Sequence, residues 1–220
     1  MRTSAVPEVP TGRLIAIDGV QSNDVAAATE VLVDAFRARD QTAGVSRFDA
    51  SGLFGELVAG TTTLPSASPR VLVLVYAADL AFRLRWEIGP ALERGSTVIA
   101  APYVATATAF GQACGLPDDW LRSLFEFAPV PGSAIVLRDR DPERVWKRKP
   151  ERGFCESCTT LLELSPAGFS RRKIRAAMSG ALTAIAEQHG RPFRKRDLKA
   201  FADELFKPRR RRAPDRRAAP

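Results

Sequence analysis

Residues 13–39 constrain the fold of this chain more than any other stretch. They open with an apolar run from Arg13 to Asp18, pass through a turn over residues 19–24, and end in an alanine-rich helical segment over residues 25–39. An apolar strand, a turn of small residues and a helix form the first unit of an α/β sheet. The turn of such a unit faces the ligand side, at the carboxyl end of the strand. The stretch therefore predicts an α/β domain with a ligand-facing turn near its start.

This turn lacks the groups that hold a nucleotide phosphate. A phosphate-binding P-loop has the form G-x-x-x-x-G-K-[ST], in which the lysine reaches the phosphates and the hydroxyl binds Mg²⁺. Counting from Gly19, the second glycine is replaced by Asp24, the lysine by Val25 and the Ser/Thr by Ala26. The expected loop therefore has neither the cation nor the Mg²⁺ ligand of a working P-loop.

The same turn contains residues that can occupy a helix amino end themselves. Unpaired N–H groups at that end need acceptors, and Ser, Asn and Asp side chains are the preferred caps. We expect Ser22, Asn23 or Asp24 to be the N-cap of the helix. The sequence thus predicts a loop that has kept its geometry and lost its ligand chemistry.

Length and composition set the class of protein. A chain of 220 residues is long enough for one α/β domain with a sizeable core. No apolar run reaches the roughly 18 residues of a membrane span, and residues 1–12 have no apolar core of a signal peptide. The chain has three cysteines and no secretory segment, so we expect a reducing, cytoplasmic location.

The positive charge is concentrated at the carboxyl end. Residues 207–220 hold seven basic residues and one acidic residue, so they carry +6 of the total net charge of +8. This proline-rich tail has no apolar period and is typical of a disordered segment. It is either a solubilising end or a weak nucleic-acid contact through residues 207–217. We therefore expect a disordered extension over residues 1–12, one domain over 13–206 and a disordered basic tail over 207–220.

Short apolar runs alternate with helical segments along the chain, which predicts a three-layer α/β/α fold with a mostly parallel sheet of about five strands. The expected strands cover residues 13–18, 43–49, 97–101, 133–137 and, as a degraded edge strand, 191–196. The expected helices cover residues 25–39, 51–60, 70–94, 104–113, 118–127, 142–148, 166–189 and 198–205. Asp118 or Asp119 is the expected N-cap of the helix that follows Pro117.

The segment 70–94 has unusual apolar character. Its length suits one long helix that Pro90 kinks or interrupts. Leu74, Ala78, Phe82 and Trp86 fall on one row. A helix that is apolar on more than one face is buried or lies in a subunit interface. We therefore expect a homodimer through residues 70–94.

Several stretches together resemble the thymidylate kinase family of P-loop nucleoside monophosphate kinases. The resembling segments, in chain order, are residues 14–20, 46–47, 76–81, 88–95, 98–103 and 139–148. Residues 76–81 are similar to the family's Ala-Asp-Arg-Ala segment, and residues 98–103 stand where it has Val-Ile-x-Asp-Arg-Tyr. The resemblance implies a P-loop kinase-type fold and, in an active member, ATP and Mg²⁺ as cofactors.

The departures from the family fall where chemistry would occur. Besides the changes at Val25 and Ala26, the arginine of the Ala-Asp-Arg segment is Leu80, and the Asp-Arg pair before the tyrosine is Ala101-Pro102. The resemblance implies that these groups bind phosphates, Mg²⁺ and the thymidylate acceptor. Losing one electrostatic stabiliser of this kind typically costs about 10²- to 10³-fold in rate. The sequence therefore favours a degenerate member with impaired catalysis.

Three functions stay open. The first is a degenerate thymidylate-kinase-like protein that acts as a binding or regulatory partner of an unknown protein. The second is an active nucleoside monophosphate kinase, with cations relocated from residues 138–152, and the third is a nucleic-acid-associated module that uses the tail. The candidate nucleotide contacts are Gly19, Ser22, Asn23, Arg47, Asp79, Tyr103, Arg148 and Arg152. We assign no catalytic residue and no metal ligand, because Cys155 and Cys158 have no further soft ligand near them in sequence.

Overall fold

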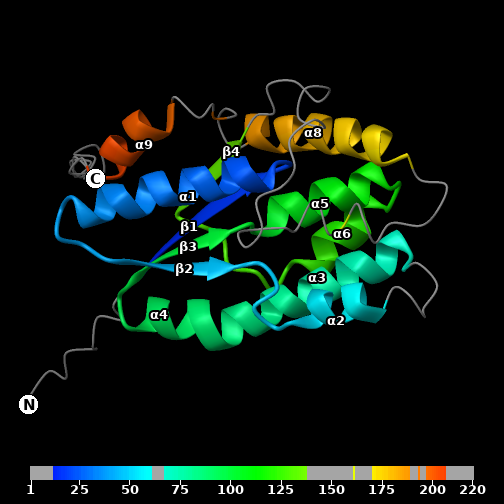
Figure 1. Ribbon diagram of the computed structural model, residues 1–220, viewed down its shortest axis with the longest axis horizontal. Coiled ribbons are helices and arrows are strands. Elements are labelled where there is room, and N and C mark those ends of the chain that lie inside the picture. The colour runs from blue at the N-terminus through cyan, green and yellow to red at the C-terminus, as the bar shows by residue number, and fades with distance from the viewer. Residues whose placement is uncertain are drawn as a thin grey trace, which may run out of the picture.

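A computed structural model of the chain describes residues 12–60, 67–137, 161, 170–188, 193 and 197–206. Its strands are β1 (Arg13–Gly19), β2 (Ala43–Arg47), β3 (Thr97–Ala101) and β4 (Ser133–Leu137). They form one parallel sheet in the order β2-β3-β1-β4 (Figure 1). The predicted parallel α/β fold is therefore confirmed, with four strands in the described part of the chain rather than about five.

The register of the sheet brings the carboxyl ends of all four strands to one edge. Gly19 of β1 pairs with Leu137 of β4, and Arg47 of β2 pairs with Ala101 of β3. The chain leaves β1 for β2 on one side and later returns to β4 on the other. The neighbouring strands β1 and β3 are therefore the point where the strand order reverses. Ligands of open α/β sheets bind outside the strand ends at such a point.

Helices cover both faces of the sheet (Figure 1). One face carries α1 (Ser22–Arg37) and α9 (Leu198–Leu205), which pack against each other. The other carries α3 (Pro69–Arg83), α5 (Val104–Ala113) and α8 (Arg171–Gln188), together with the shorter α2 (Leu53–Gly60) and α6 (Asp118–Leu124). This arrangement is the three-layer architecture of a P-loop kinase-type fold.

The pattern of β1 explains why both faces are covered. Leu14 and Ala16 lie in the core beneath α3, α5 and α8, whereas Ile15 and Ile17 lie in the core beneath α1 and α9. Successive side chains of a strand point to opposite faces. A strand that is apolar at every position must therefore be buried on both sides.

The long helix predicted over residues 70–94 is confirmed as one continuous helical rod with a π-helical turn inside it. After α3 the backbone forms a π-helix, η1 (Leu84–Ile88), and then α4 (Gly89–Glu93). Pro90 cannot donate the hydrogen bond that an α-helix would need at that point. The Gly89 N–H reaches back to the Leu84 carbonyl, so the wider turn lies directly before the proline.

Several predicted boundaries differ from the structure. β2 ends at Arg47 rather than at residue 49, α2 begins at Leu53, α6 ends at Leu124, and α8 begins at Arg171. Of the predicted edge strand over 191–196, the described residue Phe193 forms an isolated bridge with Leu137. The predicted helix over 142–148, residues 1–11 and 207–220 of the predicted terminal segments, and Cys155 and Cys158 lie outside the described residues. Gly12, the last residue of the predicted N-terminal extension, is described, and its N–H donates to the Leu92 carbonyl.

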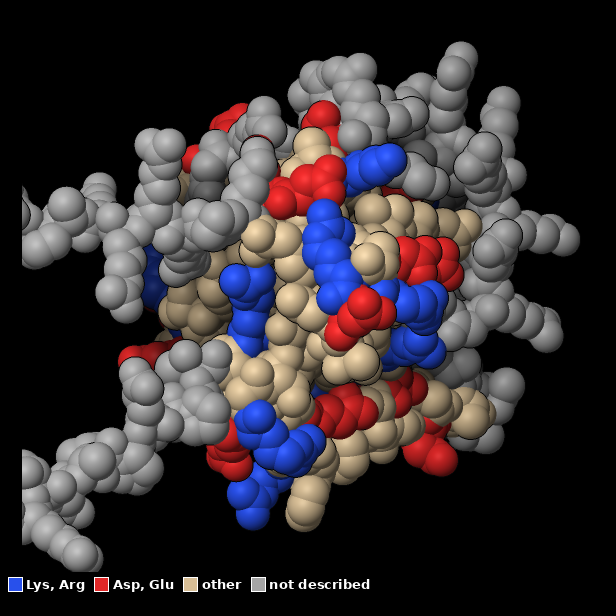
Figure 2. All heavy atoms as spheres, turned by 90° about the vertical axis from the view of Figure 1, so that its left-hand side faces the viewer, with Lys and Arg blue, Asp and Glu red and all other residues tan. Residues whose placement is uncertain are grey.

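Charge on the described surface is mixed. The face shown in Figure 2 carries basic and acidic side chains next to each other over the described residues. This agrees with a domain whose excess positive charge is mostly in the tail. Within the described ranges, no helix is both long enough and apolar enough to cross a bilayer.

Candidate functional site

The connection between β1 and α1 is shorter than a P-loop. β1 ends at Gly19 and α1 begins at Ser22, so the connection contains only Val20 and Gln21. Gln21 is the N-cap, its side chain makes no capping hydrogen bond, and its carbonyl accepts from the N–H groups of Asp24 and Val25. The predicted cap at Ser22, Asn23 or Asp24 is wrong, because these three residues already lie in the first helical turn. The turn predicted over residues 19–24 is therefore shorter than expected, because α1 begins at Ser22 rather than at residue 25.

Val25 occupies the core at the position where the resemblance places the P-loop lysine. Its side chain is 1% exposed and packs in the core beneath α1. Its Cγ2 is 3.1 Å from the point that a Cβ on Gly19 would occupy, and the Leu137 Cβ is 3.2 Å from the same point. The space under the strand-to-helix turn is therefore filled by apolar side chains of the chain itself.

Ser22 and Asn23 both lie in the first turn of α1. Ser22 is buried, and its hydroxyl has no hydrogen-bond partner within the part of the chain that the structure describes. Asn23 and Asp24 are half-buried in the first turn. The carboxylate of Asp24 lies near the helix amino end, where it complements the helix dipole. An anionic ligand at this end would meet that negative charge.

The amino end of α5 is satisfied by Asp18, which lies at the carboxyl end of β1. Asp18 is buried and its Oδ1 accepts from the backbone N–H groups of Tyr103, at 2.9 Å, and Thr106, at 3.0 Å. The Thr106 hydroxyl accepts from the Gly19 N–H at 3.3 Å. Burial raises the pKa of Asp18, while the hydrogen bonds from Thr106 and Tyr103 act to lower it. The Asp18 carboxyl group thus accepts hydrogen bonds from free N–H groups at the amino end of α5, beside the point where the strand order reverses.

Tyr103 is part of this internal network. Its hydroxyl donates to the Pro129 carbonyl at 2.8 Å, and its own carbonyl accepts from the Tyr76 hydroxyl at 2.5 Å. Burial and, next, the nearby Asp18 charge raise the pKa of Tyr103, whereas Arg83 acts to lower it. The phenol predicted to contact a nucleotide is therefore buried and already hydrogen-bonded within the chain.

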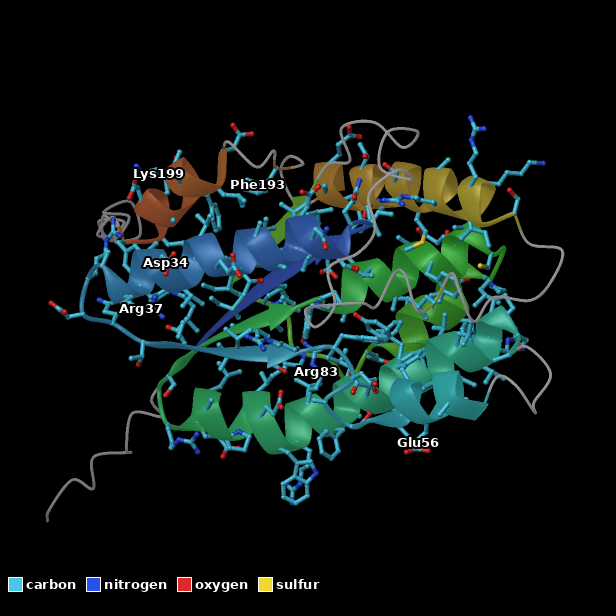
Figure 3. All side chains as sticks on the ribbon, in the orientation of Figure 1. Asp34, Arg37, Glu56, Arg83, Phe193 and Lys199 are labelled. Atoms are coloured by element: carbon cyan, nitrogen blue, oxygen red, sulfur yellow. The ribbon has the colours of Figure 1, made fainter. Side chains whose placement is uncertain are left out.

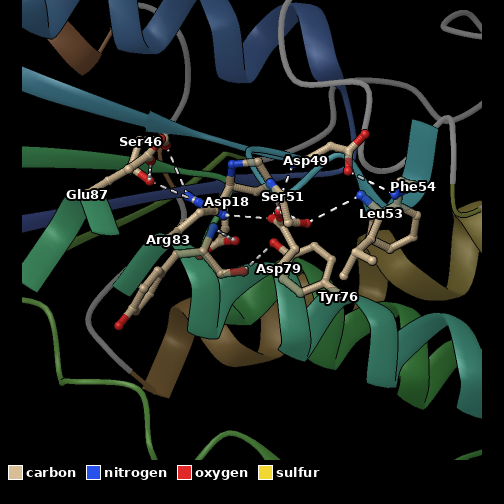
Figure 4. A network of polar contacts seen from close by, with 12 residues as sticks. Asp18, Ser46, Asp49, Ser51, Leu53, Phe54, Tyr76, Asp79, Arg83 and Glu87 are labelled. Carbon is tan, nitrogen blue, oxygen red and sulfur yellow. Dashed lines mark hydrogen bonds and ion pairs between the residues drawn. The ribbon is translucent and has the colours of Figure 1, made fainter. Parts of the chain in front are cut away.

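Asp79 holds the connection between β2 and α2. Its carboxylate is fully buried and accepts from the Asp49 N–H at 3.1 Å, the Ser51 N–H at 3.0 Å and the Ser51 hydroxyl at 2.8 Å (Figure 4). Asp49 in turn accepts from the N–H groups of Phe54 and Gly55, both at 2.8 Å, and so caps α2. The candidate ligand contact Asp79 is thus engaged with the backbone.

Arg83 is the residue that sequence reasoning missed. Its guanidinium is 0% exposed and lies between the sheet and α3 (Figure 3). Nε donates to the Ser46 hydroxyl at 2.9 Å, and Nη2 donates to the carbonyls of Ser46 and Pro102 at 3.0 and 2.9 Å. Ser46 then donates to a Glu87 carboxylate oxygen at 2.6 Å (Figure 4). Arg83 therefore ties the carboxyl ends of β2 and β3 together.

A sequence signal for Arg83 did exist. The buried row of α3 includes Leu72, Tyr76 and Leu80, and Arg83 continues this row at helical spacing. A lone arginine on an apolar helix face must find polar partners in the interior. Those partners come from β2 and from the residue after β3, which the sequence does not place beside the helix.

The remaining candidate residues divide into two groups. Arg47 is exposed at the carboxyl end of β2. Arg148 and Arg152 lie outside the described residues, as does the whole segment 138–152. Within the described ranges, no group of three acidic, histidine or cysteine side chains is placed to hold a metal ion. At the β1–α1 turn itself, the buried Val25 supplies no cation for a triphosphate.

Comparison with known proteins gives one consistent result. A probable thymidylate kinase of Pyrococcus abyssi is 28% identical over 170 residues, covering 74% of this chain and 80% of that protein. One of Pyrobaculum calidifontis is 30% identical, covering 61% of this chain and 67% of that protein. A thymidylate kinase of Xanthomonas oryzae pv. oryzae is 32% identical, covering 66% of this chain and 63% of that protein. No protein-family model matches the chain.

Proposed function

This chain belongs to the thymidylate kinase family, and we propose that it is a member with impaired phosphoryl transfer that acts as a binding or regulatory partner. The observation that carries the proposal is the two-residue connection between β1 and α1, with Val25 buried at the lysine position. Phosphoryl transfer depends mainly on positioned cations and backbone N–H groups around the phosphates. A turn that is short and filled by apolar side chains cannot provide them.

The acceptor side of the fold supports the same proposal. Leu80 stands at the position of the family's arginine and is fully buried in the core. Pro102 carries no cation, and its carbonyl accepts from Arg83. Losing one electrostatic stabiliser typically costs roughly 2.7–4 kcal/mol of transition-state energy. Such losses are not additive within one site, but losses on both the donor and acceptor sides leave little activity.

The alternative of an active kinase needs relocated cations. Within the described residues, Arg83 is buried near the carboxyl ends of the strands, but three of its hydrogen bonds go to Ser46 and Pro102. A guanidinium that is engaged in this way is a poor replacement for a phosphate-binding group. The described part of the site therefore favours the impaired member over the active kinase.

A coupled assay for ADP release from ATP and dTMP tests the proposal. A characterised thymidylate kinase in the same buffer serves as the positive control. We expect turnover far below that control. A turnover number of about 1 s⁻¹ or faster, which is the low end of the range for ordinary kinases, would contradict the proposal. A thermal-shift titration with ATP/Mg²⁺ and with mononucleotides then shows whether nucleotide binding survives without transfer, because a ligand that binds only the folded state raises the melting temperature.

We propose that one partner is a second copy of this chain, docked on the outer row of α3 and η1. Four large apolar side chains on this row stay exposed, namely Val71, Leu74, Phe82 and Trp86. Leu74 and Phe82 lie four residues before and four residues after the small residue Ala78. A two-fold axis at Ala78 would place Leu74 against Phe82 of the second copy and let the two helices approach closely. Symmetric, self-complementary contacts of this kind are the commonest basis of homodimers.

Sedimentation equilibrium tests this partner. Leu74 is 44% exposed and Val130, outside the row, is 91% exposed. Leu74→Glu should give a monomer, whereas the wild type and the control Val130→Glu should give a dimer. A wild-type chain that stays monomeric at the highest concentration reached would contradict this part of the proposal.

A further inference from the structure

We propose that Asp79 is a latch that holds residues 48–60, here called the β2–α2 strap, against α3, and that Arg83 is a competing partner that releases it. Asp79 and Arg83 lie one helical turn apart on α3. The inference concerns movement at the carboxyl end of β2. It rests on contacts within the chain and does not depend on the proposed loss of phosphoryl transfer.

The docked strap is held by one carboxylate. Asp79 accepts three hydrogen bonds, all from the first residues of the strap at Asp49 and Ser51. Asp49 then holds the first turn of α2 through the amides of Phe54 and Gly55. Asp79 therefore holds α2 indirectly, because it binds the backbone of Asp49, and the Asp49 carboxylate binds the first turn of α2.

The docked state leaves Arg83 incompletely satisfied. Its Nη1 is buried and has no hydrogen-bond partner among the described residues. Its distance to Asp79 Oδ2 is 3.9 Å, which is too long for a hydrogen bond. A buried N–H of a charged group without an acceptor is rare and costly. This cost disappears when Asp79 turns from the strap to Arg83.

The docked state also strains the strap itself. Asp49 has a φ of 59°, in the left-handed region that residues with a Cβ adopt at a cost. Its hydrogen bond to Asp79 fixes it there. Release of the strap lets Asp49 relax. Two unfavourable local features, at Asp49 and at Arg83, are therefore removed by the same movement.

Aromatic packing opposes the release. Phe48 and Phe54 of the strap lie 4.6 Å apart, and Phe48 lies 5.8 Å from Tyr76 on α3, measured between ring centroids. Phe54 is almost completely buried. Aromatic packing therefore favours the docked state, whereas the pairing of Arg83 with Asp79 favours the released state. Two such states, favoured by opposing terms, form a bistable element of the kind that ligands and partners bias.

Hydrogen exchange of the full chain tests the latch. In Ser51→Ala, Asp79 loses one of its three hydrogen bonds, and it loses it in the docked state only. The docked state is therefore less favoured, and the hydrogen-exchange rates of the Phe54 and Gly55 amides should rise about fivefold. In Arg83→Met, the released state loses its Asp79 pair, while the bonds from Arg83 to Ser46 and Pro102 are lost from both states. Exchange at the same amides should therefore fall by about tenfold.

The control is Asp119→Asn on α6, which removes an exposed carboxylate that pairs with Arg122. It should leave exchange in the strap unchanged. A purely structural Arg83 predicts the opposite sign, because its removal would loosen the strap. Faster or unchanged strap exchange in folded Arg83→Met would overturn the proposal.

A second measurement keeps the test decisive if Arg83→Met does not fold. In the wild type and in Ser51→Ala, ¹⁵N relaxation dispersion should report the same rate and minor population for the Arg83 Nε and for the amides of Phe54 and Gly55. Dispersion at the strap amides with none at the Arg83 side chain would refute the exchange of partners.

Discussion

Placing a lysine at position 25 tests whether the β1–α1 turn has the backbone structure of a P-loop with substituted side chains, or a different backbone structure. In a P-loop the side chain at this position points to the phosphates. Here Val25 is 1% exposed and packs against Gly19 and the core beneath α1. The substitution Val25→Lys should therefore destabilise the fold without creating a nucleotide site.

The expected cost follows from the burial of this position. Losing a fully buried valine removes about 2 kcal/mol of apolar burial. A buried ammonium costs about 1.4 kcal/mol for each unit by which its pKa is lowered, and fully buried lysines shift by up to roughly 5 units. The long lysine stem can carry part of the charge towards water, which reduces this second cost. We expect a total loss of at least about 3 kcal/mol in the free energy of unfolding.

Urea unfolding followed by circular dichroism measures this loss. Glu30→Lys, at an exposed position of the same helix, is the matched control and should change stability by no more than about 0.5 kcal/mol. Each variant is then titrated with ATP and Mg²⁺. A Val25→Lys protein that is as stable as the control and gains Mg²⁺-dependent ATP binding would refute the reasoning, because the side chain would then face the ligand.

Three further predictions concern the interior. Burial raises the pKa of Asp18 above its ordinary value of 3.8, so its contribution to stability is present below that pH and is lost as pH rises through the raised pKa. The stability of Asp18→Asn relative to the wild type should therefore increase with pH in that window in urea titrations. Tyr76→Phe leaves the buried Tyr103 carbonyl without its donor and should cost about 1–3 kcal/mol in urea unfolding. Gly89→Ala places a Cβ 2.7 Å from a backbone carbonyl of the π turn and should lower the melting temperature, whereas Gly180→Ala, with open space around it, should raise it.

The sequence was sufficient for the elements whose pattern is strong. The core strands around Ile15, Ile99 and Ile135 were predicted because short runs rich in β-branched residues and bounded by turns usually form buried strands. The rod over residues 70–94 was predicted from its length, and its π-helical turn lies directly before Pro90. These predictions needed only local periodicity.

The first residue of a helix was less predictable, because Ser, Asn and Asp occur both at the N-cap position and within the first helical turn. Ser22 and Asn23 are good caps, but they are also tolerated in a first turn, and the alanine-rich segment after them extends the helix towards the strand. The predicted cap at Asp118 or Asp119 is wrong for the same reason, since α6 begins at Asp118 and Pro117 is its N-cap.

The polar network of the candidate site could not be predicted from local pattern. Asp18 meets Thr106 across 88 positions in the sequence, and Arg83 meets Ser46 across 37. Such contacts depend on the order of the strands, which places β1, β2 and β3 side by side. The family resemblance pointed to positions 25, 26, 80 and 101–102 as the changed ones. It could not show that Asp18 and Arg83 form hydrogen bonds between elements that are distant in the sequence.

Isothermal titration of the wild-type chain with ATP in the presence and absence of Mg²⁺ tests the central claim most directly. The structure predicts no Mg²⁺-dependent binding tighter than about 1 mM, equivalent to about −4.1 kcal/mol, because the β1–α1 turn is short and filled by Val25. Micromolar, Mg²⁺-dependent binding that is lost in Asn23→Ala or Asp24→Ala would contradict it, since the turn would then hold a triphosphate after all.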